Sequence, residues 1–355
     1  MRKQITLAAA LCMAFFAATN LNAQDIHFSQ FYEIAILRNP GLTGIFSGDY
    51  KAGVNYKRQW SQISVPFQTV FASAEVRIPT NDAGDVVSFG LATTFDKAGS
   101  ISFNSLQAYP AINYSKCLED KHQSYLSAGF TAGYVQRSVD PSKMTFASQY
   151  QSGGYNSGNA SGENFQNVKL NYYDIGAGVS FNSSMGEFNN VNYYIGAAAF
   201  HINKPRAAFN SVEASMRLDM KWNGNLGINY HVNERVGVTV HGNYSRQGKY
   251  QEILAGGLCS WRNIDESGTK TLFTVYGGMF MRLGDAFIPT VKLDYKAYSF
   301  TFSYDINTSN LKTASNSIGG MEISIFTRGV LSKGPWAQNK NKCPRFEDMI
   351  LPEFQ

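Results

Sequence analysis

Residues Met216–Tyr230 read MRLDMKWNGNLGINY, and their side chains alternate in character over fifteen positions. One phase is largely apolar and consists of Met216, Leu218, Met220, Trp222, Leu226, Ile228 and Tyr230. The other phase is charged or amide-bearing and includes Arg217, Asp219, Lys221, Asn223, Asn225 and Asn229. Because successive side chains of a strand point to opposite faces, this pattern predicts one long strand with an apolar and a polar face. Soluble strands usually have about 5–6 residues, whereas a tilted membrane strand needs about 9–11, so the length favours a membrane.

The same alternation recurs from about Tyr50 to Ile325 and predicts about fourteen strands. Their expected ranges are 50–57, 70–78, 87–95, 106–114, 126–134, 175–181, 194–200, 216–230, 236–245, 251–261, 271–282, 286–295, 298–304 and 321–325. Aromatic residues stand near the strand ends, as in the girdles of outer-membrane barrels. We therefore predict an all-β fold, a transmembrane antiparallel β-barrel. A large secreted β-sandwich or a soluble barrel is the alternative.

An even strand number places both ends of the chain on the periplasmic side of such a barrel. The odd-numbered connections are then extracellular. The fifth connection of the chain, 138–169, is one of these; it is the longest and is rich in Gly, Ser, Asn and Gln. The expected organisation is a short periplasmic N-terminal segment at 24–48, the barrel at 49–328 and a periplasmic tail at 329–355.

The N-terminus predicts export. Met1-Arg2-Lys3 is basic, an apolar stretch follows from Leu7, and Ala23 is a small residue before the expected cleavage site. This arrangement is typical of a cleavable signal peptide, here 1–23, and leads us to expect an outer-membrane location. Three cysteines remain, so at most one disulfide can form, and the sequence leaves its pairing open among Cys117, Cys259 and Cys343.

Composition excludes several classes of protein. Charged residues make up 16% of the chain and aromatic residues 14%, unlike the composition of a disordered chain. The net charge of +5 is spread without a basic run, so we expect no nucleic-acid partner.

No motif for a metal, a cofactor or catalysis is present in the sequence. The nearest approach to a catalytic pair is His241 with Ser245, but residues four apart on a strand are about 13 Å apart, too far for a nucleophile and its base. We interpret these two residues as polar lining of the lumen and expect no enzyme.

Several segments resemble the PorP/SprF family of the Bacteroidetes type IX secretion system, in matching order over nearly the whole mature chain. They are Gln24–Tyr32, Asn39–Gly44, Tyr193–Pro205, Gln247–Gly256, Arg282–Ala286, Ser303–Leu311, Gly319–Ser324 and Cys343–Phe346. The chain departs from the family at Lys204, where Arg is commoner.

The resemblance implies a non-enzymatic outer-membrane component of type IX secretion and gliding machinery. Its partners would be outer-membrane lipids, a secreted adhesin-like protein with a type B C-terminal domain, and periplasmic ring and lipoprotein components. We expect it to bind that cargo and to help export or anchor it. Two alternatives remain: a structural PorP-like barrel that docks the periplasmic ring, and an outer-membrane diffusion channel or hydrophobic-ligand transporter.

Each candidate partner-binding residue also has a structural interpretation. Asn39-Pro40-Gly41 would form a turn that leads into the first strand, Tyr304 and Asp305 would end a strand in a hydrogen-bonded turn, and His201 and Pro205 would shape an extracellular loop or contact cargo. Cys343, Arg345 and Phe346 lie in the tail, where a cation beside an aromatic ring favours docking to a partner. The candidate residues are His201, Pro205, Tyr304, Asp305, Cys343, Arg345 and Phe346.

Overall fold

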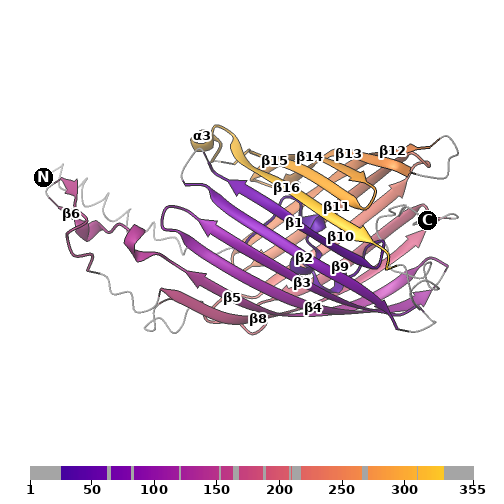
Figure 1. Cartoon of the computed structure of the whole chain (residues 1–355), viewed down its shortest axis with the longest axis horizontal. Coiled ribbons are helices and arrows are strands. Elements are labelled where there is room, and N and C mark those ends of the chain that lie inside the picture. The colour runs from indigo at the N-terminus through magenta and orange to yellow at the C-terminus, as the bar shows by residue number, and fades with distance from the viewer. Residues whose placement is uncertain are drawn as a thin grey trace, which may run out of the picture.

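A closed antiparallel barrel of fourteen strands forms from the described residues of the computed structural model, as the sequence predicted (Figure 1). The described residues are 25–61, 65–80, 84–119, 121–151, 153–162, 168–186, 189–207, 209, 217–265, 271–309 and 311–331. The barrel strands are β1 (Tyr50–Gln59), β2 (Phe67–Pro79), β3 (Val86–Ala98), β4 (Phe103–Glu119), β5 (Ser124–Ser138), β8 (Lys169–Met185), β9 (Val191–Phe200), β10 (Lys221–His231), β11 (Val236–Gln247), β12 (Tyr250–Ile264), β13 (Thr271–Arg282), β14 (Ala286–Tyr295), β15 (Tyr298–Asn307) and β16 (Ile318–Gly329).

Closure joins the first barrel strand to the last. β1 pairs with β16 along its whole length, from Tyr50 opposite Gly329 to Gln59 opposite Gly320. Each strand therefore has a neighbour on both sides. The wall leaves no open sheet edge, which is the condition for β-structure to cross a lipid bilayer.

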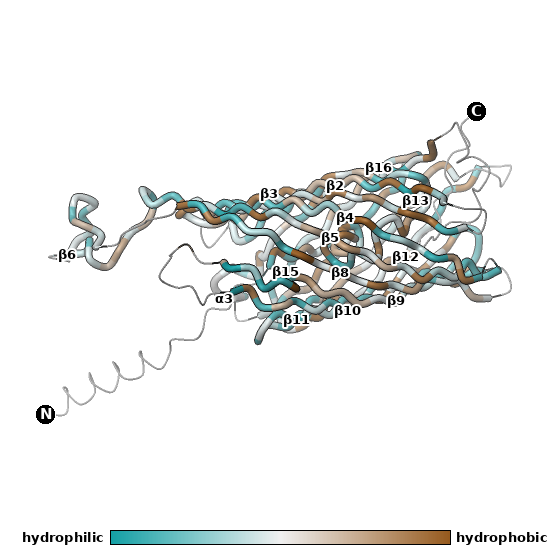
Figure 2. Tube along the Cα trace, turned by 90° about the horizontal axis from the view of Figure 1, so that it is seen from below, coloured by the Kyte–Doolittle hydropathy of each residue, from teal (hydrophilic) through white to brown (hydrophobic). Residues whose placement is uncertain are grey.

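Hydrophilic and hydrophobic residues alternate along the strands (Figure 2), and their exposure divides them into an apolar outer face and a polar lumen. On β10, Trp222 is 57% exposed on the outside, whereas Asn223 is 5% exposed and faces inward. Phe130 on β5 and Ile195 on β9 are each 60% exposed, so the outer face carries large apolar side chains all round. Among the described residues, no helix has both the length and the apolar character needed to span a membrane.

The two ends of the barrel differ in their connections. We call one end the long-loop rim, because there β5 is joined to β8 by the long connection 139–168, whose described part projects away from the barrel (Figure 1). This connection contains η3 (Pro141–Lys143), η4 (Ala147–Gln149) and the hairpin of β6 (Tyr150–Gln151) with β7 (Gly154–Tyr155). The same rim carries α3 (Leu311–Ser315). The opposite end is the short-turn rim, where connections such as 232–235 and 296–297 are brief.

The strand predicted at 216–230 is shorter than expected. β10 begins only at Lys221, which pairs with Phe200 on one side and Gln247 on the other. Both neighbouring strands end at that level, so the preceding residues have no ladder to join. The Leu218 backbone N–H donates instead to the Pro205 carbonyl at 3.0 Å, and the Leu218 side chain is buried in the interior rather than facing lipid. Met216 lies outside the described residues.

The N-terminal segment lies inside the barrel. We call residues 25–49 the plug; it contains η1 (Phe31–Glu33), α2 (Ala35–Arg38) and η2 (Pro40–Leu42). The expectation of a periplasmic segment at 24–48 is therefore corrected for its described residues. The physical reason is that the plug buries apolar side chains against the lumen wall while charged wall residues bind its polar groups. The buried apolar plug residues are Phe28, Phe31, Tyr32, Ile34, Ile36, Leu42 and Phe46. The predicted signal peptide 1–23 and the tail beyond Leu331 lie outside the described residues.

Candidate functional site

The plug sits against wall glycines at its turn η2. The Asn39 side chain accepts a hydrogen bond from the Gly41 backbone N–H at 2.8 Å, and Pro40 presets the first position of the turn. A Cβ at Gly129 of β5 would collide with the Pro40 carbonyl, and one at Gly178 of β8 would collide with the Asn39 side chain. Glycine at these two wall positions therefore admits the plug backbone.

Two plug residues near the long-loop rim are held by a buried carboxylate. Glu322 of β16 accepts hydrogen bonds from the backbone N–H groups of Ser29 at 2.7 Å and Gln30 at 3.0 Å. The Gln30 side chain donates to the Glu322 carbonyl at 2.9 Å, and the Ser324 hydroxyl donates to Gln30 Oε1. Charge-assisted bonds of this kind are the strong ones, so they fix the register of the plug against the wall.

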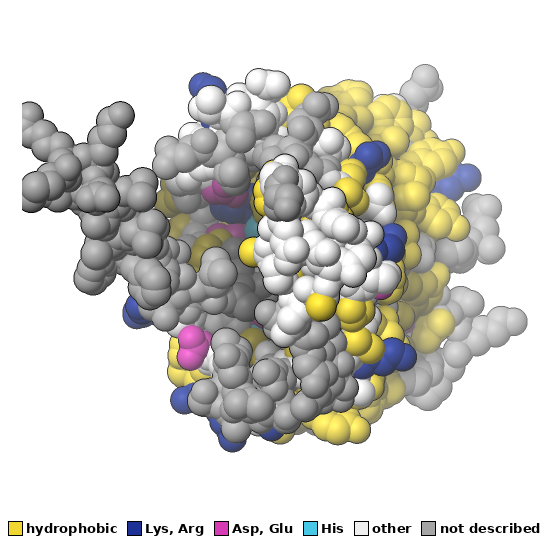
Figure 3. Space-filling model, turned by 90° about the vertical axis from the view of Figure 1, so that its left-hand side faces the viewer, with side chains coloured by type: hydrophobic (Ala, Val, Ile, Leu, Met, Phe, Trp, Pro, Cys, Tyr) yellow, Lys and Arg dark blue, Asp and Glu magenta, His cyan; other side chains and the backbone are white. Residues whose placement is uncertain are grey.

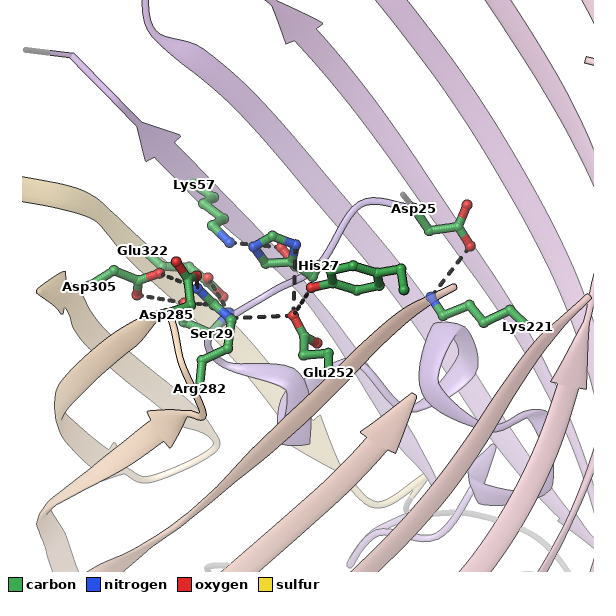
Figure 4. A network of polar contacts seen from close by, with 11 residues as sticks. Asp25, His27, Ser29, Lys57, Lys221, Glu252, Arg282, Asp285, Asp305 and Glu322 are labelled. Carbon is green, nitrogen blue, oxygen red and sulfur yellow. Dashed lines mark hydrogen bonds and ion pairs between the residues drawn. The ribbon is translucent and has the colours of Figure 1, made fainter. Parts of the chain in front are cut away.

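Arg282 of β13 links this part of the plug to three further strands (Figure 4). Its guanidinium donates to Ser29 Oγ at 3.0 Å and to Asp305 of β15 at 3.2 Å, and it lies 3.4 Å from Glu252 of β12. The Ser29 hydroxyl in turn donates to Asp305 at 2.6 Å. Ser29 therefore lies at the centre of a network that holds the plug, β13 and β15 together.

A second anchor lies deeper in the lumen, on the side of the short-turn rim. Glu33 of the plug is 2% exposed and faces three cations from different strands. Its carboxylate lies 3.0 Å from Lys51 of β1, 2.9 Å from Lys292 of β14 and 3.5 Å from Arg328 of β16. A buried charge persists only when it is compensated, so each partner needs the others.

At the mouth of the lumen, His201 joins Asp25 of the plug to Asp174 of the wall. We call these three residues the latch. His201 Nε2 lies 2.8 Å from Asp25 of the plug, and its Nδ1 lies 2.9 Å from Asp174 of β8. Tyr109 donates to Asp174 at 2.9 Å, and Lys221 lies 3.4 Å from Asp25.

The latch holds its histidine in the charged form. Burial by itself would lower the pKa of His201, but the carboxylates of Asp25 and Asp174 raise it to about 9. Burial would raise the pKa of Asp25, but Lys221 and His201 hold it well below its usual value. The latch is therefore an ion pair at neutral pH.

His241 and Ser245 line the lumen, as the sequence indicated. The His241 ring stacks on Tyr32 of the plug with 5.1 Å between ring centres, and its Nδ1 lies 3.1 Å from the Tyr194 hydroxyl. His241 and Ser245 are both buried. The histidine thus packs against the plug, and this contact gives it a structural use.

The structure describes four of the seven predicted site residues, at different kinds of position. His201 belongs to the latch, and Pro205 is buried at the same rim, where its carbonyl accepts from Leu218. Asp305 faces inward and binds the plug, whereas Tyr304 is half-buried on the opposite face of β15. The turn predicted at Tyr304 and Asp305 is wrong, because β15 continues to Asn307. Cys343, Arg345 and Phe346 lie outside the described residues.

Other predicted features have structural outcomes too. Asn39-Pro40-Gly41 does form a turn, but deep in the lumen rather than at the entry to β1. No disulfide joins the two described cysteines, Cys117 and Cys259, and Cys343 lies outside the described residues. Within the described ranges, no group of three or more His, Cys, Asp or Glu side chains is arranged to hold a metal ion.

The sequence did not single out the charged residues that join the plug to the barrel wall, chiefly Asp25, Glu33, Arg282 and Glu322. A signal was available in the lumen-facing phase of the strands, where full charges recur rather than amides and hydroxyls. These charged wall positions are Lys51, Lys57, Glu75, Arg77, Arg282, Lys292, Glu322 and Arg328. Buried charges of both signs at this density need partners, and the plug supplies some of them.

Comparisons with known proteins agree with this architecture. The family model described as type IX secretion system membrane protein PorP/SprF matches residues 20–326. No curated protein matches the chain.

Solved structures match the barrel at low sequence identity. A Pseudomonas aeruginosa FadL homologue has a TM-score of 0.50 and 9% identity, over 81% of this chain and 91% of that one. The deletion mutant of TodX, a monoaromatic hydrocarbon channel, has a TM-score of 0.50 and 10% identity, over 82% of this chain and 92% of that one. At such identities the likeness concerns the fold alone. The barrel and the family together support an outer-membrane location, and the chain belongs to the PorP/SprF family of type IX secretion system membrane proteins.

Proposed function

We propose that the chain is a non-catalytic outer-membrane component of type IX secretion that binds a secreted protein through its type B C-terminal domain. In this role it helps to export or anchor that cargo, which would be adhesin-like and would serve gliding motility. Family membership supports a place in the secretion machinery. The cargo role rests on where the barrel leaves surface for a partner.

The filled lumen is the observation that carries the proposal. The plug contacts the wall from Asp25 at the long-loop rim, through Glu33, to Phe46, whose carbonyl accepts from Arg77 near the short-turn rim. A polypeptide in transit would have to displace the plug from these contacts. Cargo therefore binds at a rim rather than passing through the lumen.

The long connection 139–168 is the surface that we assign to cargo. Its hairpin of β6 and β7 pairs Tyr150 with Tyr155, and these side chains are 60% and 49% exposed. The hairpin stands away from the barrel wall (Figures 1 and 2). Exposed tyrosines are favoured at protein interfaces because they bury much area at little entropic cost. This rim faces the cell exterior in the proposed orientation.

The second candidate function is that of a structural PorP-like barrel that docks the periplasmic ring. It would use the tail with Cys343, Arg345 and Phe346, and in the proposed orientation that tail faces the periplasm. A diffusion channel or ligand transporter is the third candidate. The plug argues against it, because a solute would have to pass the contacts that hold the plug to the wall.

A pull-down from the native outer membrane in mild detergent, read by mass spectrometry, tests the proposal. Three tagged versions are compared: the wild type, a variant with 145–162 replaced by a short Gly-Ser linker, and a variant that ends at residue 331. We expect the wild type and the tail-truncated form to retain a large secreted protein, and the loop variant to lose it. Ring proteins without cargo, lost on tail truncation, would favour the scaffold. Recovery of the barrel alone, where known complexes survive, would contradict both.

A further inference from the structure

A buried arginine of the plug has no carboxylate partner. Arg38, the last residue of α2, is 7% exposed, and no described carboxylate lies within ion-pair distance of it. Its Nη1 donates to the Tyr194 hydroxyl at 2.8 Å, and its guanidinium lies over the rings of Phe31 and Tyr194 at 5.7 and 5.3 Å. Its Nε is buried without a hydrogen-bond partner among the described residues. An uncompensated buried cation is costly, which distinguishes Arg38 from the cations that share Glu33.

Arg38 lines a cavity of about 60 Å³ between the plug and the wall formed by β10, β11 and β12. One side of the cavity is apolar and includes Ile34, Leu37 and Leu254. The other side is polar and includes Lys221, Asn243 and Ser245. The cavity lies toward the long-loop rim, since Lys221 is the first residue of β10 there. The end-on view has a hollow lined by acidic, basic and histidine side chains at this rim (Figure 3).

The acidic groups at and beside this cavity already have partners. Glu252 lines the cavity and lies 3.4 Å from Arg282, and Asp25 is bound by His201 and Lys221. Arg38 is thus a cation of this lining without a carboxylate at ion-pair distance among the described residues, and it stands beside an apolar wall in a space that holds roughly four to six water-sized groups.

We propose that this cavity is a binding site for a small monocarboxylate with a short apolar chain. The carboxylate binds the Arg38 guanidinium, whose planar fork matches it, while Lys221 on the same lining stays paired with Asp25. The apolar chain packs on Leu37, Ile34 and Leu254. This site is independent of the proposed cargo role, because it lies inside the lumen and not on the projecting loop.

Calorimetric titration of butyrate into the full-length barrel in a non-ionic detergent tests the site. Butyramide, which has the same shape without the charge, is the ligand control. Two variants disrupt the site in different ways: Arg38→Gln removes the cation, and Leu37→Trp fills the apolar side while keeping Arg38. Arg246→Gln makes the same chemical change at an exposed arginine of β11 and serves as the matched control. Circular dichroism and heat-modified gel mobility check that each variant is folded.

We expect saturable binding of butyrate to the wild type and to Arg246→Gln, and no binding of butyramide. Each of the two site variants should weaken butyrate binding about tenfold or more, in line with the loss of a charged hydrogen-bonding partner or of the space for the chain. If butyrate does not bind the wild type, or binds both site variants as tightly as the wild type, the proposal is wrong. Equal competition by chloride or phosphate would also overturn it, because the site would then hold an adventitious ion only.

Discussion

Two regions of the plug, its first residues at the rim and Glu33 in the deep lumen, are held by different chemistry. At the long-loop rim, the Asp25 side chain keeps 22% of its surface exposed and depends on a histidine that can lose its charge. In the deep lumen, Glu33 is bound by two lysines and an arginine, and all four side chains are nearly fully buried. From this difference we expect the Glu33 contacts to persist over the pH range in which the Asp25–His201 contact is lost. We therefore expect the first residues of the plug to become mobile at high pH while η2 keeps its contacts with the wall.

Breaking the deep anchor should have the largest effect. Glu33→Gln leaves Lys51, Lys292 and Arg328 buried without their carboxylate, which should lower the free energy of unfolding by about 3–5 kcal/mol. Urea-induced unfolding in detergent, followed by tryptophan fluorescence, measures this loss. Glu234→Gln, at an exposed position of the turn between β10 and β11, is the control. Equal stability of the two variants would contradict the anchor.

The rim latch should respond to pH where the deep anchor does not. The pKa of His201 is raised from an ordinary value near 6.5 to about 9, so the latch contributes fully below about pH 6.5 and is lost as the pH rises through 9. The loss is on the order of 3 kcal/mol, at 1.36 kcal/mol per pKa unit.

Spin labels on the plug measure this opening. In a background with Cys117, Cys259 and Cys343 changed to Ser, a label at Ile26→Cys should become mobile between pH 6.5 and 9.5, while one at Ala35→Cys should not. His201→Gln should remove the pH dependence, and His122→Gln, at the other rim, should leave it unchanged. A label at residue 26 that is equally immobile at both pH values would argue against the latch.

Adding a side-chain atom where η2 contacts the wall should have an intermediate effect on the free energy of unfolding. Gly129→Ala places a Cβ against the Pro40 carbonyl and should cost about 1–3 kcal/mol as the plug shifts. Gly224→Ala on β10 meets no neighbouring atom and is the matched control. Unfolding midpoints in urea compare the two. Equal unfolding midpoints for Gly129→Ala and Gly224→Ala would mean that the plug backbone does not need this close approach to the wall.

The smallest effect on stability is expected outside the barrel. Tyr150→Ala should change the free energy of unfolding by less than about 0.5 kcal/mol, because its side chain is exposed on the projecting hairpin. The same change should reduce cargo recovery severalfold in the pull-down. Tyr173→Ala, which is 73% exposed on β8 of the barrel wall, should leave recovery intact. Identical cargo recovery in both variants would remove the hairpin from the cargo surface.

Much of the barrel could be predicted because strand periodicity is a local signal. The alternation of Leu226, Ile228 and Tyr230 with Asn225 and Asn229 indicates one strand face without reference to any other part of the chain. The start of β10 could not be found this way. It depends on where the neighbouring strands end, at Phe200 and Gln247.

The plug could not be predicted, because its contacts are distant in sequence. Ser29 and Glu322 meet across 293 positions, and neither residue carries a local pattern that names the other. The short turns of the plug also lack the length at which helical periodicity becomes legible. His201 was singled out only through the family resemblance, and its partner Asp25 became visible only in three dimensions.

Single-channel conductance in planar bilayers tests the central claim most directly, with the wild-type barrel compared with a variant that lacks residues 25–46. We expect the wild type not to conduct, because the plug occupies the lumen. The deletion variant should conduct steadily and still migrate as a folded barrel. A wild type that conducts as well as the deletion variant would contradict that claim.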